Sequence, residues 1–381
     1  MRGVSPGGTS TLTELIQKPR HIAGLDGLRA ISVVSVIGLH TLQRLSLSHH
    51  VPWWMLAVSN GALGVFIFFV ISGYLITTLL LREQGKAGRI SLKSFYLRRA
   101  FRILPPLYVY IAVIAVLGAL RLIPGVNTRE IVTALLFLRN YAHGVSLWAF
   151  EHLWSLCIEE QFYLLWPSIL VFCLLRRREG AGKALAAKIA LAVIVVEPIV
   201  RVVWFRLPNV THNSGMIHLN CDGLMFGALA ALTQGTKHFE ALYRRVTRWP
   251  WLLPVLLFGV SGASGVRFQN YWNFPLGWTI DGALAMFWMV WLTRNPETTM
   301  GRALSLGWVM WIGRLSYSLY IWQTLFTHHE NVTIAGDAWW MWPPLSWPCI
   351  LGLAVVSYYV VEQPSLRLRD VFLTRMRWHE L

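Results

Sequence analysis

Residues 57–81 read AVSNGALGVFIFFVISGYLITTLLL and contain no charged side chain. An uncharged apolar run of this length can cross a bilayer as one helix, because about 20 residues span the hydrocarbon region. Similar runs recur along the chain. The predicted spans lie near 23–42, 57–81, 103–122, 156–175, 188–206, 216–234, 250–266, 276–293, 307–327 and 344–362. The sequence therefore predicts an all-α membrane protein with about ten transmembrane helices.

Composition supports a membrane protein. Of 381 residues, 55% are hydrophobic and only 14% are charged, with a mean hydropathy of +0.49. A soluble chain of this size would carry far more charge on its surface. The net charge of +16 is spread over short basic clusters between apolar runs, which is typical of retained cytoplasmic loops. We therefore expect the lipid bilayer as a partner and expect no binding of nucleic acid.

The positions of the basic residues predict the topology. If the N-terminus is cytoplasmic and ten spans alternate, about 25 of the 34 basic residues fall inside and about 6 outside. The stretch 130–150 is apolar at first but is broken by Arg139, Asn140 and His143, and Glu151 follows it directly. An eleventh span there would reverse every later loop, so we predict an outer loop or a partly inserted hairpin. Both termini are then cytoplasmic, in a multi-pass protein of the inner (cytoplasmic) membrane.

The chain shows no repeat of fixed period and no linker. We expect a cytoplasmic N-terminal segment (1–21), one transmembrane domain (22–365) and a basic cytoplasmic tail (366–381). Residues 1–20 lack the short apolar core and cleavage site of a signal peptide. The cysteines at 157, 173, 221 and 349 lie in or beside apolar runs without metal-ligand spacing. We therefore predict structural thiols and no metal site.

The first predicted span carries ionisable residues, which are costly in lipid and often functional. Asp26 and Arg29 lie near its inner end and His40 near its outer end. Arg29 and His40 are eleven residues apart, so a helix places them within about 20° of one face and roughly 16 Å apart. This face offers a cation at one end and a proton acceptor at the other. The alternative for His40 is an imidazole bonded to a carbonyl, which is commoner for an isolated histidine.

Two adjacent carboxylates, Glu159 and Glu160, open the fourth predicted span at the depth expected for His40. A carboxylate bonded to one nitrogen of an imidazole orients the ring and raises the basicity of the other nitrogen. The alternative is a role at the start of the helix, where the helix dipole favours negative charge. Two such groups cannot both face lipid, and we expect one of them to form a hydrogen bond with the imidazole of His40.

A basic cluster precedes the third predicted span and includes Arg98, Arg99 and Arg102. Arg98 and Arg102 are four residues apart, so a helix brings them to one face. Guanidinium groups match phosphate oxygens in a bidentate way, and such a cluster suits a phosphate clamp. The alternative is an anchor that only retains this loop in the cytoplasm.

These residues resemble the acyltransferase-3 family of integral membrane acyl transferases. The similarity extends over nearly the whole chain as ordered short blocks, each weak alone. The matching blocks are LDGLRAI (25–31) with His40, FFVISGYLI (68–76), RRAFRI (98–103) with Pro105, WSLCIEEQFYLLWP (154–167), Asp222-Gly223 with Gly227, LSYSLYIW (315–322), and Glu362 with Pro364.

The resemblance implies a ten-helix fold and an O-acyltransferase that uses acyl-CoA, commonly acetyl-CoA, presented from the cytoplasm. Acceptors in the family include surface glycans, peptidoglycan, lipid-linked sugars and glycosylated secondary metabolites. The implied roles are His40 as catalytic base, Glu159 or Glu160 as its partner, and Arg29 with Arg98, Arg99 and Arg102 in donor binding. Within the matched blocks we expect substrate contacts from Asp26, Ser72, Trp154, Tyr163, Asp222 and Tyr320.

Two positions depart from the family pattern. Cys157 replaces a common serine, and Gln323 replaces a common histidine after Trp322. Gln323 argues against a second essential histidine there, whereas Cys157 leaves open an acyl-enzyme thioester as a minor alternative. Two other functions remain open: a transporter or flippase of a lipid-linked sugar, which would also need intramembrane charges, and a membrane scaffold or sensor without catalysis.

Overall fold

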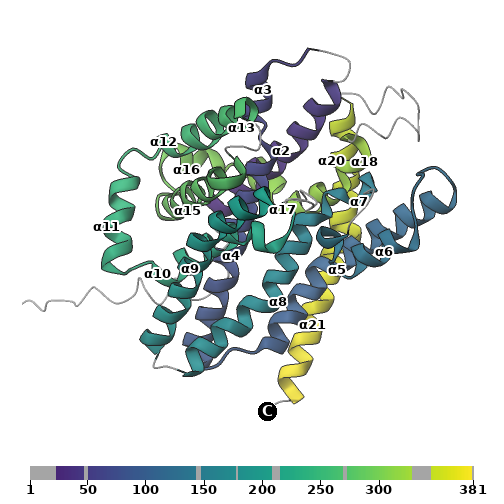
Figure 1. Cartoon of the computed structure of the whole chain (residues 1–381). Coiled ribbons are helices and arrows are strands. Elements are labelled where there is room, and N and C mark those ends of the chain that lie inside the picture. The colour runs from purple at the N-terminus through teal and green to yellow at the C-terminus, as the bar shows by residue number, and fades with distance from the viewer. Residues whose placement is uncertain are drawn as a thin grey trace, which may run out of the picture.

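The computed structural model describes residues 23–46, 50–142, 147–176, 179–207, 215–268, 273–327 and 345–379. Every regular element in these ranges is a helix (Figure 1), which confirms the all-α prediction. The long helices are α2 (Ala23–Leu45), α4 (Gly61–Ala87), α5 (Leu92–Ala119), α8 (Leu153–Arg176), α9 (Glu179–Arg206), α10 (Cys221–Thr233), α15 (Trp278–Arg294), α17 (Gly307–Trp322), α20 (Ser346–Ser357) and α21 (Gln363–His379). The predicted N-terminal segment 1–21 lies outside the described residues.

Shorter helices connect and extend these. They are α3 (Trp53–Val58), α6 (Thr128–Leu135), η1 (Arg139–Tyr141), α7 (Trp148–Glu151), η2 (Ile217–Leu219), α11 (Lys237–Val246), α12 (Leu252–Pro254), η3 (Val255–Ser261), α13 (Gly262–Phe268), η4 (Asn273–Gly277), α16 (Thr299–Leu304), α18 (Thr324–Thr327) and η7 (Tyr358–Glu362). The π-helical η7 joins α20 to α21, and η3 joins α12 to α13.

Six described segments are long and apolar enough to cross a membrane, which supports a multi-pass membrane protein. They are Gly24–Leu45, Trp53–Ala87, Leu92–Ala119, Trp148–Arg176, Pro275–Arg294 and Ser346–Thr374. A helix overlaps each of the other predicted ranges as well, but these helices are shorter or carry more charge. The count of ten spans and the cytoplasmic position of both termini therefore stay predictions.

The long helices extend beyond the apolar runs that predicted them. Helix α5 begins at Leu92, eleven residues before the predicted start of its span at 103. Ser91 caps it, since its hydroxyl oxygen accepts a hydrogen bond from the backbone N–H of Ser94 at 3.3 Å. Apolarity marks the part of a helix that contacts hydrocarbon, whereas the cap decides where the helix starts.

The stretch 130–150, predicted as an outer loop or a partly inserted hairpin, forms short elements in its described part. Helix α6 ends at Leu135 and α7 contains only four residues, so neither is long enough to cross a bilayer. The segment is fixed by a buried ion pair, with 3.0 Å between Arg139 Nη1 and Glu130 Oε2. The amide of Asn140 also pairs with that of Gln161 on α8.

Close helix packing depends on glycines of α4 and α10. A Cβ atom added to Gly227 would collide with the carbonyl of Val70 and lie 2.5 Å from the backbone nitrogen of Tyr74. A Cβ atom at Gly73 would in turn collide with the carbonyl of Leu224. Small residues that let backbones approach are the usual means of helix association in lipid, where no hydrophobic effect drives it.

We therefore expect Gly227→Ala to lower the stability of the protein by about 1–3 kcal/mol, because the two backbones would have to move apart. Gly352→Ala on α20 is the matched control, since nothing lies within 4 Å of a Cβ atom there. The measurement is the thermal unfolding midpoint of both variants in detergent. Equal midpoints would contradict the close-packing argument.

The two ends of the bundle differ. Figure 1 shows the C-terminal ends of α8 and α21 at one end and α3 at the opposite end.

Helix α11 is held to the end of α15 by Arg294, whose two terminal nitrogens each donate a 2.8 Å hydrogen bond to Glu240. These bonds lower the pKa of the Glu240 carboxyl to about 2, so the pair remains ionised at neutral pH.

Candidate active site

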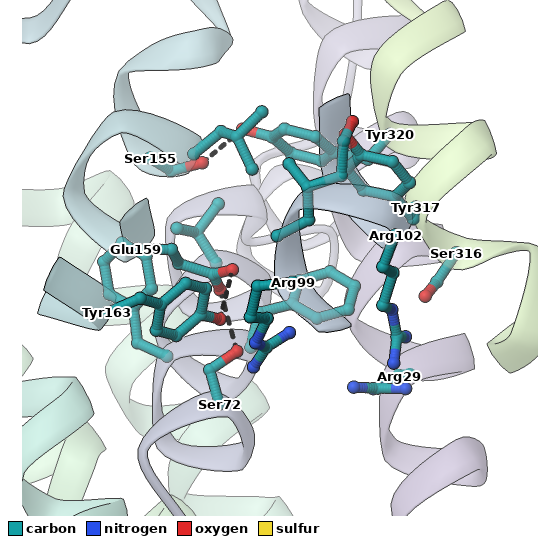
Figure 2. Close-up of a pocket in the computed structure, with 15 residues that line it drawn as sticks. Arg29, Ser72, Arg99, Arg102, Ser155, Glu159, Tyr163, Ser316, Tyr317 and Tyr320 are labelled. Atoms are coloured by element: carbon teal, nitrogen blue, oxygen red, sulfur yellow. Dashed lines mark hydrogen bonds between the residues drawn. The ribbon is translucent and has the colours of Figure 1, made fainter. Parts of the chain in front are cut away.

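Three arginines and one carboxylate line a pocket between helices α2, α4, α5, α8 and α17. We call it the arginine pocket and define it by Arg29, Arg99, Arg102 and Glu159. Arg99 and Arg102 are three residues apart on α5 and therefore share a face. The side chains of Arg29 and Arg102 end next to each other (Figure 2). Three guanidinium groups face one carboxylate, so the pocket has an excess of positive charge.

Both oxygens of Glu159 accept hydrogen bonds inside this pocket. Ser72 donates to Oε1 at 3.0 Å and Tyr163 donates to Oε2 at 2.9 Å. The guanidinium of Arg99 lies over the ring of Tyr163, 4.1 Å from its centroid, which is a cation–π geometry. Glu160 does not line the pocket, and its buried Oε1 accepts no hydrogen bond from the described residues. The two adjacent glutamates thus have different surroundings.

Arg98 is not part of the arginine pocket. Its guanidinium pairs with Glu83 of α4 at 2.9 Å, and the Arg98 side chain is 36% exposed. Glu83 also accepts a hydrogen bond from the backbone N–H of Ser91. Of the predicted cluster, the structure therefore brings Arg99 and Arg102 together with Arg29, and it places Arg98 at the junction of α4 and α5.

His40 lines a second cavity of about 510 Å³, a size typical of small-molecule sites. We call it the histidine cavity and define it by His40, Glu151, His152 and Trp154. The Nδ1 atom of His152 lies 2.8 Å from the hydroxyl oxygen of Thr324. Helix α2 is continuous from Ala23 to Leu45, so Arg29 and His40 are about 16 Å apart along its axis. The predicted separation of Arg29 and His40 therefore holds for this helix.

The arginine pocket and the histidine cavity adjoin. Val65 and Tyr320 line both of them. Helix α8 runs past both as well, since Trp154 lines the histidine cavity and Glu159 lines the arginine pocket. These two residues are five positions apart, or about 7.5 Å along the helix. Glu159 therefore lies nearer the arginines than the sequence suggested.

The predicted substrate residues divide into two groups. Ser72, Tyr163 and Tyr320 line the arginine pocket, and Trp154 and Tyr320 line the histidine cavity. Asp26 and Asp222 are buried and line neither. The structure thus gathers four of the six at the two adjoining spaces.

Asp222 belongs to a buried charge network that sequence reasoning missed. Its Oδ1 lies 2.5 Å from Arg201 Nη2, and the hydroxyl of Thr279 donates to its Oδ2 at 2.6 Å. Arg201 is 0% exposed, and Glu197 lies 3.7 Å from it, one turn earlier on α9. We call Glu197, Arg201, Asp222 and Thr279 the Arg201 network. Its sequence signal was available, because an ionisable residue in an apolar run is costly.

The two departures from the family pattern lie apart from both spaces. Cys157 is 1% exposed and lines neither the arginine pocket nor the histidine cavity, which gives no support to a thioester on this residue. Gln323 is fully buried, and its side-chain oxygen accepts a hydrogen bond from Thr327. Among the described residues, no cluster of three or more histidine, cysteine, aspartate or glutamate side chains has a metal-binding arrangement.

Several polar residues at these spaces were given no role from the sequence, among them Glu151, His152 and Ser155. Glu151 and His152 line the histidine cavity, and Ser155 lines the arginine pocket. All three lie within nine residues of Glu160, Ser155 near the start of the block that carried the resemblance and the other two just before that block. Nothing in their spacing alone separated them from ordinary helix-start residues.

Comparison with known proteins identifies the family. The family model described as "Acyltransferase domain" matches residues 22–362. A protein of Staphylococcus aureus (strain COL) with a provisional O-acetyltransferase name is 30% identical over 332 residues. The O-acetyltransferase OatA of Staphylococcus aureus (strain NCTC 8325 / PS 47) is 28% identical over 336 residues. Each match covers 81% of this chain and 51% of the relative, so the chain spans about half the length of these relatives.

No solved structure matches the chain. The family match covers the arginine pocket, the histidine cavity and every residue that lines them. It favours an enzyme over a transporter, a flippase or a scaffold. The chain belongs to the acyltransferase-3 family of membrane acyltransferases.

Proposed function

We propose that this protein is an O-acyltransferase of the bacterial inner membrane. It moves an acyl group, in the first instance acetyl, from acyl-CoA to a hydroxyl of a carbohydrate-like acceptor. The observation that carries the proposal is a pocket with three arginines and one carboxylate that shares a wall with the cavity of His40. The names of the relatives, which are O-acetyltransferases, favour acetyl as the group and oxygen as the acceptor atom.

The arginine pocket suits the phosphate groups of coenzyme A. Like charges held close together in a partly buried site repel one another, and a bound polyanion removes that repulsion. Arg29, Arg99 and Arg102 would each contribute charge-assisted hydrogen bonds to phosphate oxygens. The donor then enters from the cytoplasmic side, which is where the predicted topology of ten spans with both termini inside places these arginines.

His40 is the general base in this proposal. It accepts the proton of the acceptor hydroxyl as that oxygen attacks the carbonyl carbon of the thioester. The tetrahedral intermediate collapses by cleavage of the C–S bond. His40 returns the proton to the departing sulfur, and free coenzyme A leaves.

A carboxylate would stabilise the imidazolium that forms during this step. The sequence predicts Glu159 or Glu160 for this role. Both carboxylate oxygens of Glu159 already accept hydrogen bonds, from Ser72 and Tyr163. Glu151 lines the same cavity as His40. Glu151 is therefore a third candidate. Loss of turnover in Glu151→Gln with retention in Glu159→Gln would assign the role to Glu151.

The acceptor we propose is a surface glycan, a lipid-linked sugar or a glycosylated secondary metabolite. Trp154 lies on the wall of the histidine cavity, and an aromatic ring offers an apolar surface for the face of a sugar. Purified protein incubated with labelled acetyl-CoA and a membrane-glycan extract should release coenzyme A and label the glycan. If neither occurs over a range of acyl-CoAs and acceptors, O-acyl transfer is not the activity, and export of a lipid-linked sugar becomes the leading hypothesis.

Substitution of the pocket arginines should raise the KM for acyl-CoA. Removal of one charge-assisted hydrogen bond costs about 1.5–3 kcal/mol, so Arg99→Ala and Arg102→Ala should each raise KM about 10- to 100-fold. The kcat should change little, because this interaction is present in the ground state and the transition state alike. Arg98→Ala is the control, since Arg98 pairs with Glu83 outside the pocket. Equal KM values for all three variants would contradict the assignment.

A further inference from the structure

The wall between the arginine pocket and the histidine cavity contains a pair of hydroxyl groups. Tyr320 lines both spaces, and Ser155 lines the arginine pocket beside it. The Ser155 and Tyr320 oxygens are 2.6 Å apart (Figure 2). A thioester that enters from the arginines and a hydroxyl activated by His40 meet where the two spaces adjoin. In the proposed acyl transfer, the reacting carbonyl would therefore lie beside this hydroxyl pair.

The directions of the hydrogen bonds follow from simple counting. The Tyr320 hydroxyl lies 2.6 Å from the backbone carbonyl of His152, and a carbonyl can only accept. Tyr320 has one proton and donates it there. Ser155 must therefore donate its own proton to the Tyr320 oxygen at rest. Of the two hydroxyls, Ser155 can redirect its hydrogen bond to a ligand at the lower cost. The Tyr320 oxygen would then lose the hydrogen bond that it accepts from Ser155, but Tyr320 would still donate to the His152 carbonyl.

The surroundings keep this pair in place. Ser155 is 6% exposed and Tyr320 is 9% exposed. The Tyr320 ring packs against the ring of His152, with 5.5 Å between centroids. To turn Tyr320 away would break its 2.6 Å hydrogen bond to the His152 carbonyl, and the loss of a buried hydrogen bond is costly. Tyr320 thus fixes Ser155 at the junction, as preorganised donors require.

We propose that Ser155 donates the hydrogen bond that stabilises the oxyanion of the tetrahedral intermediate, and that Tyr320 is the residue that positions it. This inference deepens the proposed acyl transfer and rests on it. As the acceptor oxygen bonds to the carbonyl carbon, the π electron pair moves to the carbonyl oxygen. The Ser155 hydroxyl turns from Tyr320 to that oxygen. When the C–S bond breaks, the carbonyl reforms. The Ser155 hydroxyl keeps its proton and turns back to donate its hydrogen bond to the Tyr320 oxygen, so Ser155 is unchanged after the cycle.

Ser155→Ala should lower kcat about 10²–10³-fold, the usual effect of losing one oxyanion donor. The KM for acyl-CoA should stay near the wild-type value, because the bond forms only as charge develops. Ser32→Ala is the matched control. Ser32 is also a fully buried serine, but it donates to the Leu28 carbonyl of its own helix and lines neither space. A kcat loss of the same size in both variants would overturn the proposal.

A binding experiment removes the need to know the acceptor. A trifluoromethyl ketone of coenzyme A hydrates to a tetrahedral centre, whereas S-ethyl-coenzyme A has no carbonyl at the position of the thioester. The wild type should bind the ketone more tightly than the ethyl thioether. In Ser155→Ala the ratio of the two affinities should fall about tenfold, since one net hydrogen bond is worth about 1.4 kcal/mol. The affinity of Ser155→Ala for the ethyl thioether should not change. If Ser155→Ala lost the same affinity for both ligands, Ser155 would only line the pocket and would not stabilise the oxyanion.

The outcomes distinguish the oxyanion role of Ser155 from the proposed acyl transfer. Wild-type acyl transfer with an unaffected Ser155→Ala variant would remove the oxyanion role and leave the proposed function standing. Absence of coenzyme A release and of ligand binding in the wild type would instead remove the proposed function itself.

Discussion

His40→Ala is expected to lower the turnover of acyl transfer by about 10²–10⁴-fold, the usual contribution of a general base. The imidazole lies on the wall of a cavity that adjoins the arginine pocket and accepts the proton in the proposed mechanism, whereas alanine cannot take the proton of the acceptor hydroxyl. The affinity for acyl-CoA should persist, because the three arginines are untouched. Turnover and coenzyme A affinity of the purified variant, measured side by side, check both statements.

The control for this substitution is His238→Ala. His238 lies on the exposed face of α11, away from both spaces, so its loss should leave turnover unchanged. His40→Gln keeps a polar side chain of similar size without a base and should resemble His40→Ala. Near-normal turnover in either His40 variant would show that another group accepts the proton.

Asp222→Ala is expected to lower stability by about 3–5 kcal/mol, the cost of removing one partner from a buried ion pair. Arg201 is 0% exposed, and Asp222 is its close ion-pair partner, with Glu197 at 3.7 Å. The measurement is the thermal unfolding midpoint in detergent. Glu240→Ala is the control, since its pair with Arg294 is about 30% exposed on both sides. Exposed pairs contribute about 0–1 kcal/mol.

Replacement of both partners of the close Arg201–Asp222 pair offers a stricter test of the network. Buried ion pairs can often be exchanged for apolar residues at little cost in stability. Arg201→Leu combined with Asp222→Leu should therefore recover part of the loss seen in Asp222→Ala. If Asp222→Ala unfolds at the same temperature as the wild type, the charge network does not hold α9 to α10.

The sequence located the helices well because lipid imposes a simple rule on them. A span must be apolar over about 20 residues, and a helix overlaps every predicted range. Helix ends were less predictable. Ser91 starts α5, and Gly88 ends α4 with a φ of 68°, but both lie in polar sequence where the apolar pattern gives no information.

The site was predicted in part, and each miss has a physical cause. Spacing identified the arginine cluster, but the choice between Arg98 and Arg99 depends on Glu83, which lies on a different helix. The glutamate pair was placed at the depth of His40, whereas Glu159 lies about 7.5 Å further along α8 than Trp154. Contacts between helices decide both points, and periodicity within one helix cannot report them.

The Arg201 network has a consequence for how the protein enters the membrane. Helix α9 carries Glu197, Arg201 and Arg206 in its second half and is absent from the described helices that are apolar enough to cross alone. An arginine at the middle of a lone inserting helix costs about 2.5–3.5 kcal/mol at the translocon. Glu197 lies 3.7 Å from Arg201 on the same helix, but the closer counter-charge, Asp222, is synthesised later, on α10. We therefore expect α9 to wait at the lateral gate of the translocon until α10 emerges, so that the two helices partition into lipid as a neutralised hairpin.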